Sequence, residues 1–365
     1  MRSRWHADTA QACTSPLQLR IYTSRLLGAE ASLVLHGGGN TSVKVDEVNL
    51  FGDTETVLYI KGSGHDLSSI TERGFAPVRL EPLVRMAQLD TLGDAAMVNA
   101  MRCAMTDATA PTPSVEAILH AIIPYTYVDH THADAILTVL DTPYAQRYIQ
   151  DIFGDTLLVV PYVMPGFALA KHCAQQLAAE LKPHHQGLIL LNHGIFTWGN
   201  DAQTSYERMI QFVDMAEQYV KKQTRYKTAP MDVPVPARLA RADLRLAVSQ
   251  AAGTPMVLVP RNDDYISAFV QRADLASIAQ RGCVTPDHII RTRQLPLVGR
   301  DVAAYTQRYQ QWFHAHQANA AHELTMLDPA PRIILDAELG MLTVGRRVRE
   351  AIIAGDVYRL SLIHI

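Results

Sequence analysis

Apolar residues in the first 228 positions follow two different spacings. In five segments they recur every three or four residues, which predicts amphipathic helices. These segments are residues 17–27, 94–105, 114–123, 168–181 and 204–222, and Ser114 is the expected N-cap of the third. In six others they form short alternating or continuous runs, which predict strands at residues 32–36, 42–45, 56–60, 127–132, 157–163 and 188–191. Helices that alternate with strands predict a layered α/β domain over residues 1–228.

A change in composition separates this domain from a smaller region. A basic stretch at residues 221–227 is followed by three prolines within residues 229–237, which predicts a linker. Beyond it, helical patterns occupy residues 239–248, 265–272 and 302–316, and extended patterns occupy residues 256–260 and 332–335. We therefore expect a smaller α/β region over residues 238–359. It has no catalytic constellation and is either a connector or a partner-docking module.

The last six residues, 360–365, have a pattern of their own. The sequence Leu-Ser-Leu-Ile-His-Ile can be encoded by the end of a common sequencing-library adapter read in frame. We interpret it as a non-native tail and expect the native chain to continue beyond Arg359.

Composition and charge narrow the class of protein. The chain has 365 residues, 48% of them hydrophobic, and a formal net charge of -3, which predicts a soluble globular protein without a broad nucleic-acid surface. No apolar run is long enough to cross a bilayer, and no signal peptide is recognisable. The four cysteines are scattered, which indicates reduced thiols and no cysteine-bound metal. We expect a cytoplasmic enzyme.

Three histidines and one glutamate form the strongest chemical pattern. His130 and His132 lie two residues apart in a predicted strand, so their side chains point to the same face. His193 follows another buried strand and precedes a glycine. Three imidazoles with an open position are typical of catalytic zinc, although His130 and His132 alone fit two partly buried rings equally well. Glu116, on the helix just upstream, is then a general base or a temporary fourth ligand.

Two glycine-rich turns provide a second element. In the turn at residues 36–40, backbone N–H groups can converge on an anion, and Asn40 and Ser42 add side-chain donors. The turn at residues 61–64 can also direct backbone N–H groups at an anion, and its lysine adds a positive charge nearby. Neither turn matches a P-loop or a dinucleotide fingerprint, and each alone fits a tight hairpin-like turn. Together, upstream of a metal site, they predict a small phosphate group bound by Gly39, Asn40, Ser42, Ser63 and Gly64.

These motifs together resemble the class II aldolase/adducin family. They are Gly38-Gly-Asn40-Thr-Ser42, Ser114-Val-Glu116, His130-Thr-His132 and His193-Gly194, within a match over roughly residues 15–225. More narrowly, the chain is similar to the aldolase part of bacterial proteins that join this aldolase to a short-chain dehydrogenase, of the rhamnulose-1-phosphate aldolase/dehydrogenase type. The stretches at residues 285–288 and 328–332 resemble the segment that joins the two parts.

The resemblance implies an α/β/α sandwich with a central, mostly antiparallel sheet, assembled as a homotetramer with sites near subunit contacts. His130, His132 and His193 would hold zinc, and Asn40, Ser63, Gly64 and Ser114 would bind the substrate phosphate. Val115 departs from the family, because some sugar-phosphate aldolases have a second serine there, and this weakens the phosphate assignment. A tyrosine from a neighbouring subunit often donates the proton. The dehydrogenase domain is expected in the full-length parent.

The expected function is zinc-dependent cleavage of a 1-phospho-ketose, such as rhamnulose 1-phosphate, to dihydroxyacetone phosphate and a hydroxyaldehyde. Glu116 would remove or return the proton at carbon. A sugar-phosphate epimerase or a dehydratase of the same fold is the alternative, and a glutamate at position 116 fits aldolases and dehydratases better than epimerases. A metal-free adducin-like scaffold is a further alternative, which the intact histidines disfavour.

Overall fold

The structure is a computed structural model that describes residues 1–223, 238–320 and 324–364, apart from the side chains of residues 361, 363 and 364. It divides into two compact units, Met1–Thr224 and Arg225–Ile365. The predicted linker at residues 229–237 lies outside the described residues. No helix of the described part of the chain is long and apolar enough to cross a membrane.

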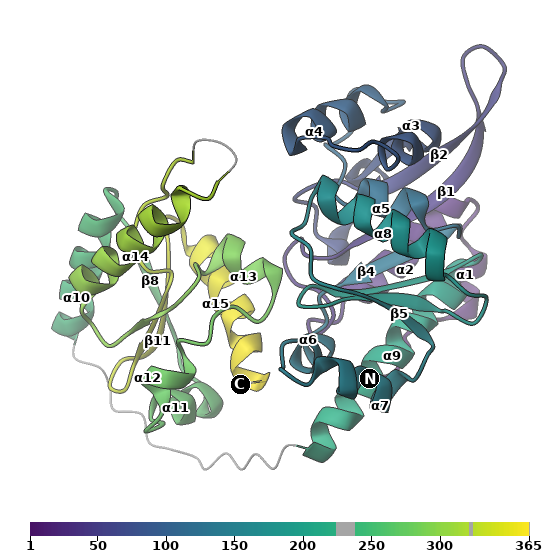
Figure 1. Ribbon diagram of the computed structural model, residues 1–365. Coiled ribbons are helices and arrows are strands. Elements are labelled where there is room, and N and C mark those ends of the chain that lie inside the picture. Colours follow the sequence, from purple (N-terminus) through teal and green to yellow (C-terminus); the bar gives the residue numbers. More distant parts are fainter. Residues whose placement is uncertain (224–237, 321–323, 365) are drawn as a thin grey trace. The chain divides into compact units, whose positions relative to one another are not determined.

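A seven-stranded sheet forms the centre of the first unit (Figure 1). The spatial order is β3-β2-β1-β4-β7-β6-β5, and every neighbouring pair is antiparallel except β5 with β6. This confirms the predicted fold class with a mostly antiparallel sheet. The strands are β1 (Asn40–Val48), β2 (Thr54–Lys61), β3 (Phe75–Arg79), β4 (Tyr127–Thr131), β5 (Leu157–Val160), β6 (Gly187–Leu190) and β7 (Gly194–Gly199).

Helices cover both faces of this sheet, because most of its strands are apolar on both sides. One face packs against α2 (Pro16–Gly28), α6 (Asp134–Leu140), α7 (Ala145–Phe153) and α9 (Ala202–Gln223). The other face packs against α3 (Leu80–Met86), α4 (Asp94–Cys103), α5 (Ala117–Ile122) and α8 (Phe167–Glu180). A short α1 (Ala7–Gln11) and two 3-10 turns, Leu67–Ser69 and Glu72–Gly74, complete the unit.

Two local predictions are wrong, and one edge strand was missed. Residues 32–36 form a turn rather than a strand, and His36 has a positive φ of 50°. The predicted helix at 114–123 begins only at Ala117, so Ser114 is not its N-cap. The cause is that the backbone of Ser114 is bonded to the end of β2, since its N–H donates to the carbonyl of Lys61 at 3.2 Å. The edge strand β3 was not predicted, because it contains Pro77, a residue tolerated mainly at sheet edges.

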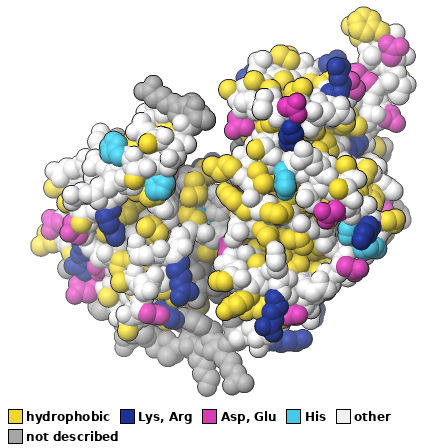
Figure 2. Space-filling view, in the orientation of Figure 1, with side chains coloured by type: hydrophobic (Ala, Val, Ile, Leu, Met, Phe, Trp, Pro, Cys, Tyr) yellow, Lys and Arg dark blue, Asp and Glu magenta, His cyan; other side chains and the backbone are white. Residues whose placement is uncertain are grey.

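The β1–β2 hairpin extends beyond the body of the unit (Figure 1). Its tip has two apolar side chains in solvent, Leu50 at 95% and Phe51 at 86% exposure (Figure 2). The hairpin therefore places hydrophobic surface away from the core.

The second unit contains a four-stranded sheet of order β8-β11-β10-β9, which confirms the predicted smaller α/β region. Its C-terminal helix α15 extends into the predicted non-native tail, and Leu362 is fully buried in the apolar core. The strands are β8 (Val257–Arg261), β9 (Leu297–Val298), β10 (Ile333–Asp336) and β11 (Gly340–Gly345). The helices are α10 (Arg238–Ala252), α11 (Asp264–Val270), α12 (Leu275–Ile278), α13 (Pro286–Arg291), α14 (Val302–Gln317) and α15 (Val348–His364).

Candidate metal centre and active site

Strand alternation brings the polar residues of β1 and β4 together under helix α5. Asn40 lies directly opposite His130 in the β1–β4 pair. Asn40, Ser42 and His130 therefore share one face of the sheet, since alternate residues of a strand point the same way. The ring of His130 stacks on Phe196 of β7 with ring centroids 4.0 Å apart, which fixes the plane of the imidazole.

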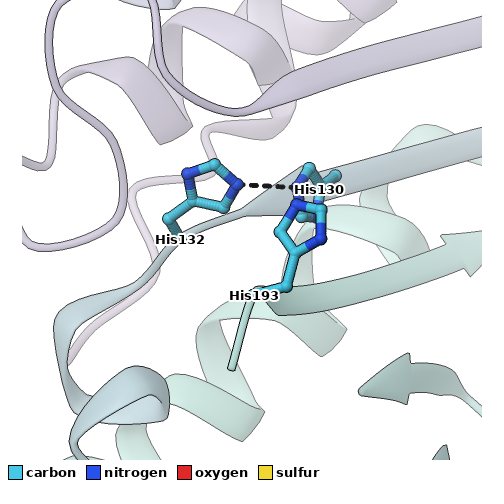
Figure 3. A group of neighbouring side chains, drawn as sticks. All are labelled: His130, His132 and His193. Carbon is cyan, nitrogen blue, oxygen red and sulfur yellow. Dashed lines mark hydrogen bonds between the residues drawn. The ribbon is translucent and has the colours of Figure 1, made fainter. Parts of the chain in front are cut away.

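Three imidazoles converge at the end of β4 (Figure 3). His130 is on β4, His132 follows the end of the strand, and His193 comes from the short loop between β6 and β7. One ring nitrogen from each of the three lies within 4.8 Å of the other two. The side chains of His130 and His193 are buried, at 0% and 4% exposure. The structure thus brings together the three histidines predicted as metal ligands.

Gly194 allows this convergence. A Cβ atom at that position would lie 2.6 Å from the carbonyl oxygen of Thr131, 2.9 Å from the ring of His130 and 3.1 Å from the ring of His132. The preceding Asn192 has a φ of 55°, and its side chain donates to Asp141 at 3.0 Å. The histidine-glycine pair is therefore required by packing as well as by chemistry.

Glu116 faces the imidazoles from the N-cap position of α5. Its Oε1 lies 3.3 Å from Nε2 of His193, and its Oε2 lies 3.5 Å from Nε2 of His130. Asn40 donates from Nδ2 to Oε2 at 2.5 Å. Burial alone would raise the pKa of Glu116, but His130, His193 and the Asn40 amide lower it, and the net pKa is well below the usual range. Within the described residues, no lysine or arginine forms an ion pair with this buried carboxylate.

Several observations fit a metal ion at this position. The Nδ1 of His130 donates to the backbone carbonyl of Ile195 at 3.0 Å, which leaves Nε2 with a free lone pair. That Nε2 lies 3.0 Å from Nε2 of His132, near the separation of about 3.3 Å expected for two imidazoles on one tetrahedral zinc ion. Oε1 of Glu116 and Nδ1 of His193 are buried without a hydrogen-bond partner. Imidazoles beside a buried carboxylate match the donors that zinc prefers.

Burial also favours the neutral form of two histidines of the site, His130 and His120. It lowers the pKa of His130 well below the usual value and lowers the pKa of His120 to about 3. Neutral imidazole is the form that binds a metal ion.

The structure places the two glycine-rich turns next to each other. Lys61 is 3% exposed, and its ammonium donates to the carbonyls of Gly37 at 2.5 Å and His65 at 2.9 Å, so it joins the turns instead of facing solvent. Ser63 and Gly64 are exposed, and Gly64 has a φ of 80°. Gly39 is buried against the carbonyl of His130, where a Cβ atom would lie at 2.8 Å.

The remaining predicted phosphate-binding residues point inward. Ser42 is fully buried, and its hydroxyl lies 2.8 Å from Nδ1 of His120. Ser114 is 8% exposed and accepts a hydrogen bond from Nδ2 of Asn40 at 3.2 Å. The contact of His120 with Asn40 and Ser42 was not predicted, although the sequence shows His120 four residues after Glu116 on the same helix.

Comparison with known proteins agrees with the fold and the motifs. The class II aldolase and adducin N-terminal domain family matches residues 18–220, and the second domain of class II aldolase matches residues 236–363. The chain therefore belongs to the class II aldolase and adducin family.

Two relatives show how the similarity is distributed. A solved structure of the N-terminal class II aldolase domain of a conserved protein from Thermoplasma acidophilum is 38% identical, with a TM-score of 0.56, and the match covers 60% of this chain and 99% of that one. The uncharacterized oxidoreductase YuxG of Bacillus subtilis (strain 168) is 30% identical, over 98% of this chain and 55% of that protein. The present chain thus spans about half the length of this curated relative.

Proposed function

We propose that the chain is a zinc-dependent aldolase that cleaves a 1-phospho-ketose, such as rhamnulose 1-phosphate, to dihydroxyacetone phosphate and a hydroxyaldehyde. The observation that carries the proposal is a buried carboxylate, without a lysine or arginine partner among the described residues, that faces three converging imidazoles. Membership of the class II aldolase and adducin family supports the reaction type.

His130, His132 and His193 would hold the metal ion. When bound, it supplies Lewis-acid polarisation to the substrate carbonyl, so that negative charge can build up on the oxygen during carbon–carbon cleavage. Three protein ligands are typical of zinc sites in which the metal ion also binds water or substrate. His130 and His193 are buried, whereas His132 is half-buried.

Glu116 is the proposed acid and base. In the cleavage direction the bond to the departing aldehyde breaks, and its electron pair remains on the carbon beside the ketone. The hydroxyl of the departing carbon gives its proton to the ionised Glu116 carboxylate as that carbon becomes the aldehyde carbonyl. A proton delivered from Glu116 to the remaining carbon then completes dihydroxyacetone phosphate, and in the reverse direction the Glu116 carboxylate removes that proton.

The phosphate is assigned to the exposed part of the glycine-rich turns. Ser63 and Gly64 are open to solvent, and Lys61 keeps their turn against the turn that contains Gly37. The backbone N–H of Ser63 donates to the carbonyl of Thr112 at 2.8 Å, so the backbone N–H of Gly64 and the Ser63 hydroxyl are the donors that we propose for the phosphate oxygens.

We also propose that this activity belongs to a longer, two-domain protein. YuxG is named an oxidoreductase and is nearly twice as long as the matched region, which supports an aldolase joined to a dehydrogenase domain in a longer parent protein. The homotetramer and the cytoplasmic location remain predictions. Gel filtration with light scattering would test the oligomeric state.

The direct experiment is a screen of 1-phospho-ketoses with and without a chelator, scoring the release of dihydroxyacetone phosphate. We expect release that stops on chelation and returns with zinc. Isomerisation without cleavage would favour an epimerase, and loss of water would favour a dehydratase. A protein that binds no metal would favour an adducin-like scaffold.

A further inference from the structure

Four buried side chains form one hydrogen-bonded chain that ends on Glu116. Ser42 contacts Nδ1 of His120 at 2.8 Å, and Nε2 of His120 contacts Oδ1 of Asn40. Nδ2 of Asn40 contacts Oε2 of Glu116 at 2.5 Å. Ser42 and His120 are fully buried, and Asn40 is 6% exposed. These hydrogen bonds therefore connect two residues of strand β1, Asn40 and Ser42, with Glu116 and with His120 of helix α5.

Donor and acceptor can be assigned for every hydrogen bond in this series, starting from the Glu116 carboxylate. An ionised carboxylate only accepts, so the Asn40 amide presents its NH2 group to Glu116 and its oxygen to His120. His120 must then carry its proton on Nε2 and donate to that oxygen. Its Nδ1 has a lone pair and accepts from the Ser42 hydroxyl. The other N–H of the Asn40 amide is directed to Ser114 at 3.2 Å.

We propose that His120 is a positioning residue, which fixes the Asn40 amide so that an N–H group holds the Glu116 carboxylate in front of the imidazoles. This inference rests on the proposed function, in which Glu116 transfers a proton. His120 touches neither the substrate nor the metal ligands through these bonds, and it acts only through Asn40. Ser42 in turn fixes the proton of His120 on Nε2. The Ser42 hydroxyl and the His120 imidazole thus both help to orient the Glu116 carboxylate. Ser42 therefore no longer belongs to the residues predicted to bind phosphate.

The geometry explains why a histidine is present at this position. An apolar side chain would leave the oxygen of Asn40 buried without a donor, and the amide would then lose its preferred orientation. If the amide turned over, its oxygen would face the Glu116 carboxylate, and two acceptors would be in contact. A displaced base loses rate, because a misplacement of about 1 Å at a reacting group costs about 100-fold.

A pair of amide substitutions separates the two ring nitrogens. His120→Gln places an NH2 group near the position of Nε2 and keeps a donor for Asn40, whereas His120→Asn reaches only the position of Nδ1 and loses it. We expect His120→Asn to lower kcat by about 100-fold with little change in KM, and His120→Gln to stay within about tenfold of the native kcat. His184→Asn, in an exposed loop, is the matched control and should be unchanged.

Ser42→Ala tests the other end of the chain. If Ser42 acts on His120, kcat falls and KM for the phosphorylated ketose does not change. A rise in KM with an unchanged kcat would instead place Ser42 on the substrate and overturn this part of the inference. Bound zinc and thermal stability should be measured on each variant, so that a folding defect is recognised.

A readout independent of turnover is the proton position on His120. Nitrogen NMR of histidine-labelled, zinc-loaded protein should show His120 with its proton on Nε2, and Ser42→Ala should loosen this preference. A proton on Nδ1, or a His120→Asn variant that keeps the native kcat, would overturn the inference. If the native protein cleaves no 1-phospho-ketose, the proposed function fails, and the tautomer measurement still decides the hydrogen-bonded chain.

Discussion

The two faces of β4 carry different kinds of buried polar network. On the face toward α2 and α9, Asp129 forms an ion pair with Arg20 at 2.6 Å, and Ser205 donates to the same carboxylate at 2.5 Å. On the face toward α5, the neighbouring residue His130 lies beside Glu116. Both carboxylates are buried, but only Asp129 has a cationic side chain as its partner within the described residues.

This difference distinguishes a structural network from a functional one. Removing a charge from water is tolerated when an opposite charge is in contact, as for Asp129 and Arg20. Glu116 instead faces His130, whose neutral form burial favours, and His193, together with one amide. Among the described residues it lacks the cationic side chain that balances Asp129, which supports our proposal that the imidazoles hold a metal ion beside it. Strand β4 thus contributes Asp129 to the ion pair on one face of the sheet and His130 to the candidate site on the other face.

The largest effects are expected on the α5 face. Glu116→Gln should keep zinc and lower the rate of ketose cleavage by about 1,000-fold, because it removes the proton-transfer group. His132→Ala should lose both zinc and turnover, because one of three ligands is missing. Metal analysis and a cleavage assay on both variants check this. Full activity of Glu116→Gln would contradict the role given to Glu116.

The matching substitution on the other face should affect stability instead. Asp129→Asn leaves Arg20 buried without a full opposite charge, and we expect a loss of about 3–5 kcal/mol in the free energy of unfolding. Glu116→Gln, measured in metal-free protein, should lose less than Asp129→Asn, since no buried lysine or arginine is left without its partner. Urea unfolding of the two variants makes the comparison. Equal losses in both would remove the distinction between the two faces.

A substitution beside the imidazoles should weaken the metal site selectively. Gly194→Ala brings a methyl group within 2.9 Å of the His130 ring and 2.6 Å of a backbone oxygen, so the ligands must shift. We expect zinc affinity to fall by about 10- to 100-fold, the range typical when groups that orient metal ligands are disturbed. Competition with a chelating dye measures it, and Gly93→Ala, where the added Cβ has no close neighbour and the backbone φ is -73°, is the spatial control.

The smallest effect concerns pH. His120 has a folded pKa of about 3 against an ordinary value of 6.5, because burial opposes its charge. The unfolded chain therefore takes up a proton below pH 6.5 that the folded chain refuses. This contribution to stability is complete above pH 6.5 and is lost as the pH falls toward 3, at about 1.4 kcal/mol per pH unit.

His120→Gln removes this titration. Urea unfolding at pH 7 and pH 5.5 should therefore show that the native chain loses about 1 kcal/mol more than the variant. The same loss in both proteins would show that His120 is not held neutral in the folded state.

The cluster of candidate ligand histidines was predictable because their spacing is a local property. His130 lies on β4, His132 directly follows the end of that strand, and His193 with Gly194 lies between two other strands, so the cluster follows from short patterns. The layered α/β fold followed from the alternation of helical and extended periods, which depends on burial of apolar residues.

The hydrogen-bonded contacts behind the triad were not predictable in the same way. Asn40 meets His120 across 80 positions in the chain, and Lys61 joins two turns 24 positions apart. Both contacts depend on the order and register of the strands, which no local pattern specifies. Ser42 shows the consequence, because its place beside a glycine turn suggested an anion ligand, whereas strand alternation directs its hydroxyl to His120.

The most direct test is a titration of zinc into metal-free protein, with bound zinc and the release of dihydroxyacetone phosphate from a 1-phospho-ketose followed together. The account predicts that both rise in parallel and level off at one zinc ion per chain, and that Glu116→Gln binds the same amount of zinc with little release. Release that does not depend on zinc, or zinc binding that survives His132→Ala, would contradict it.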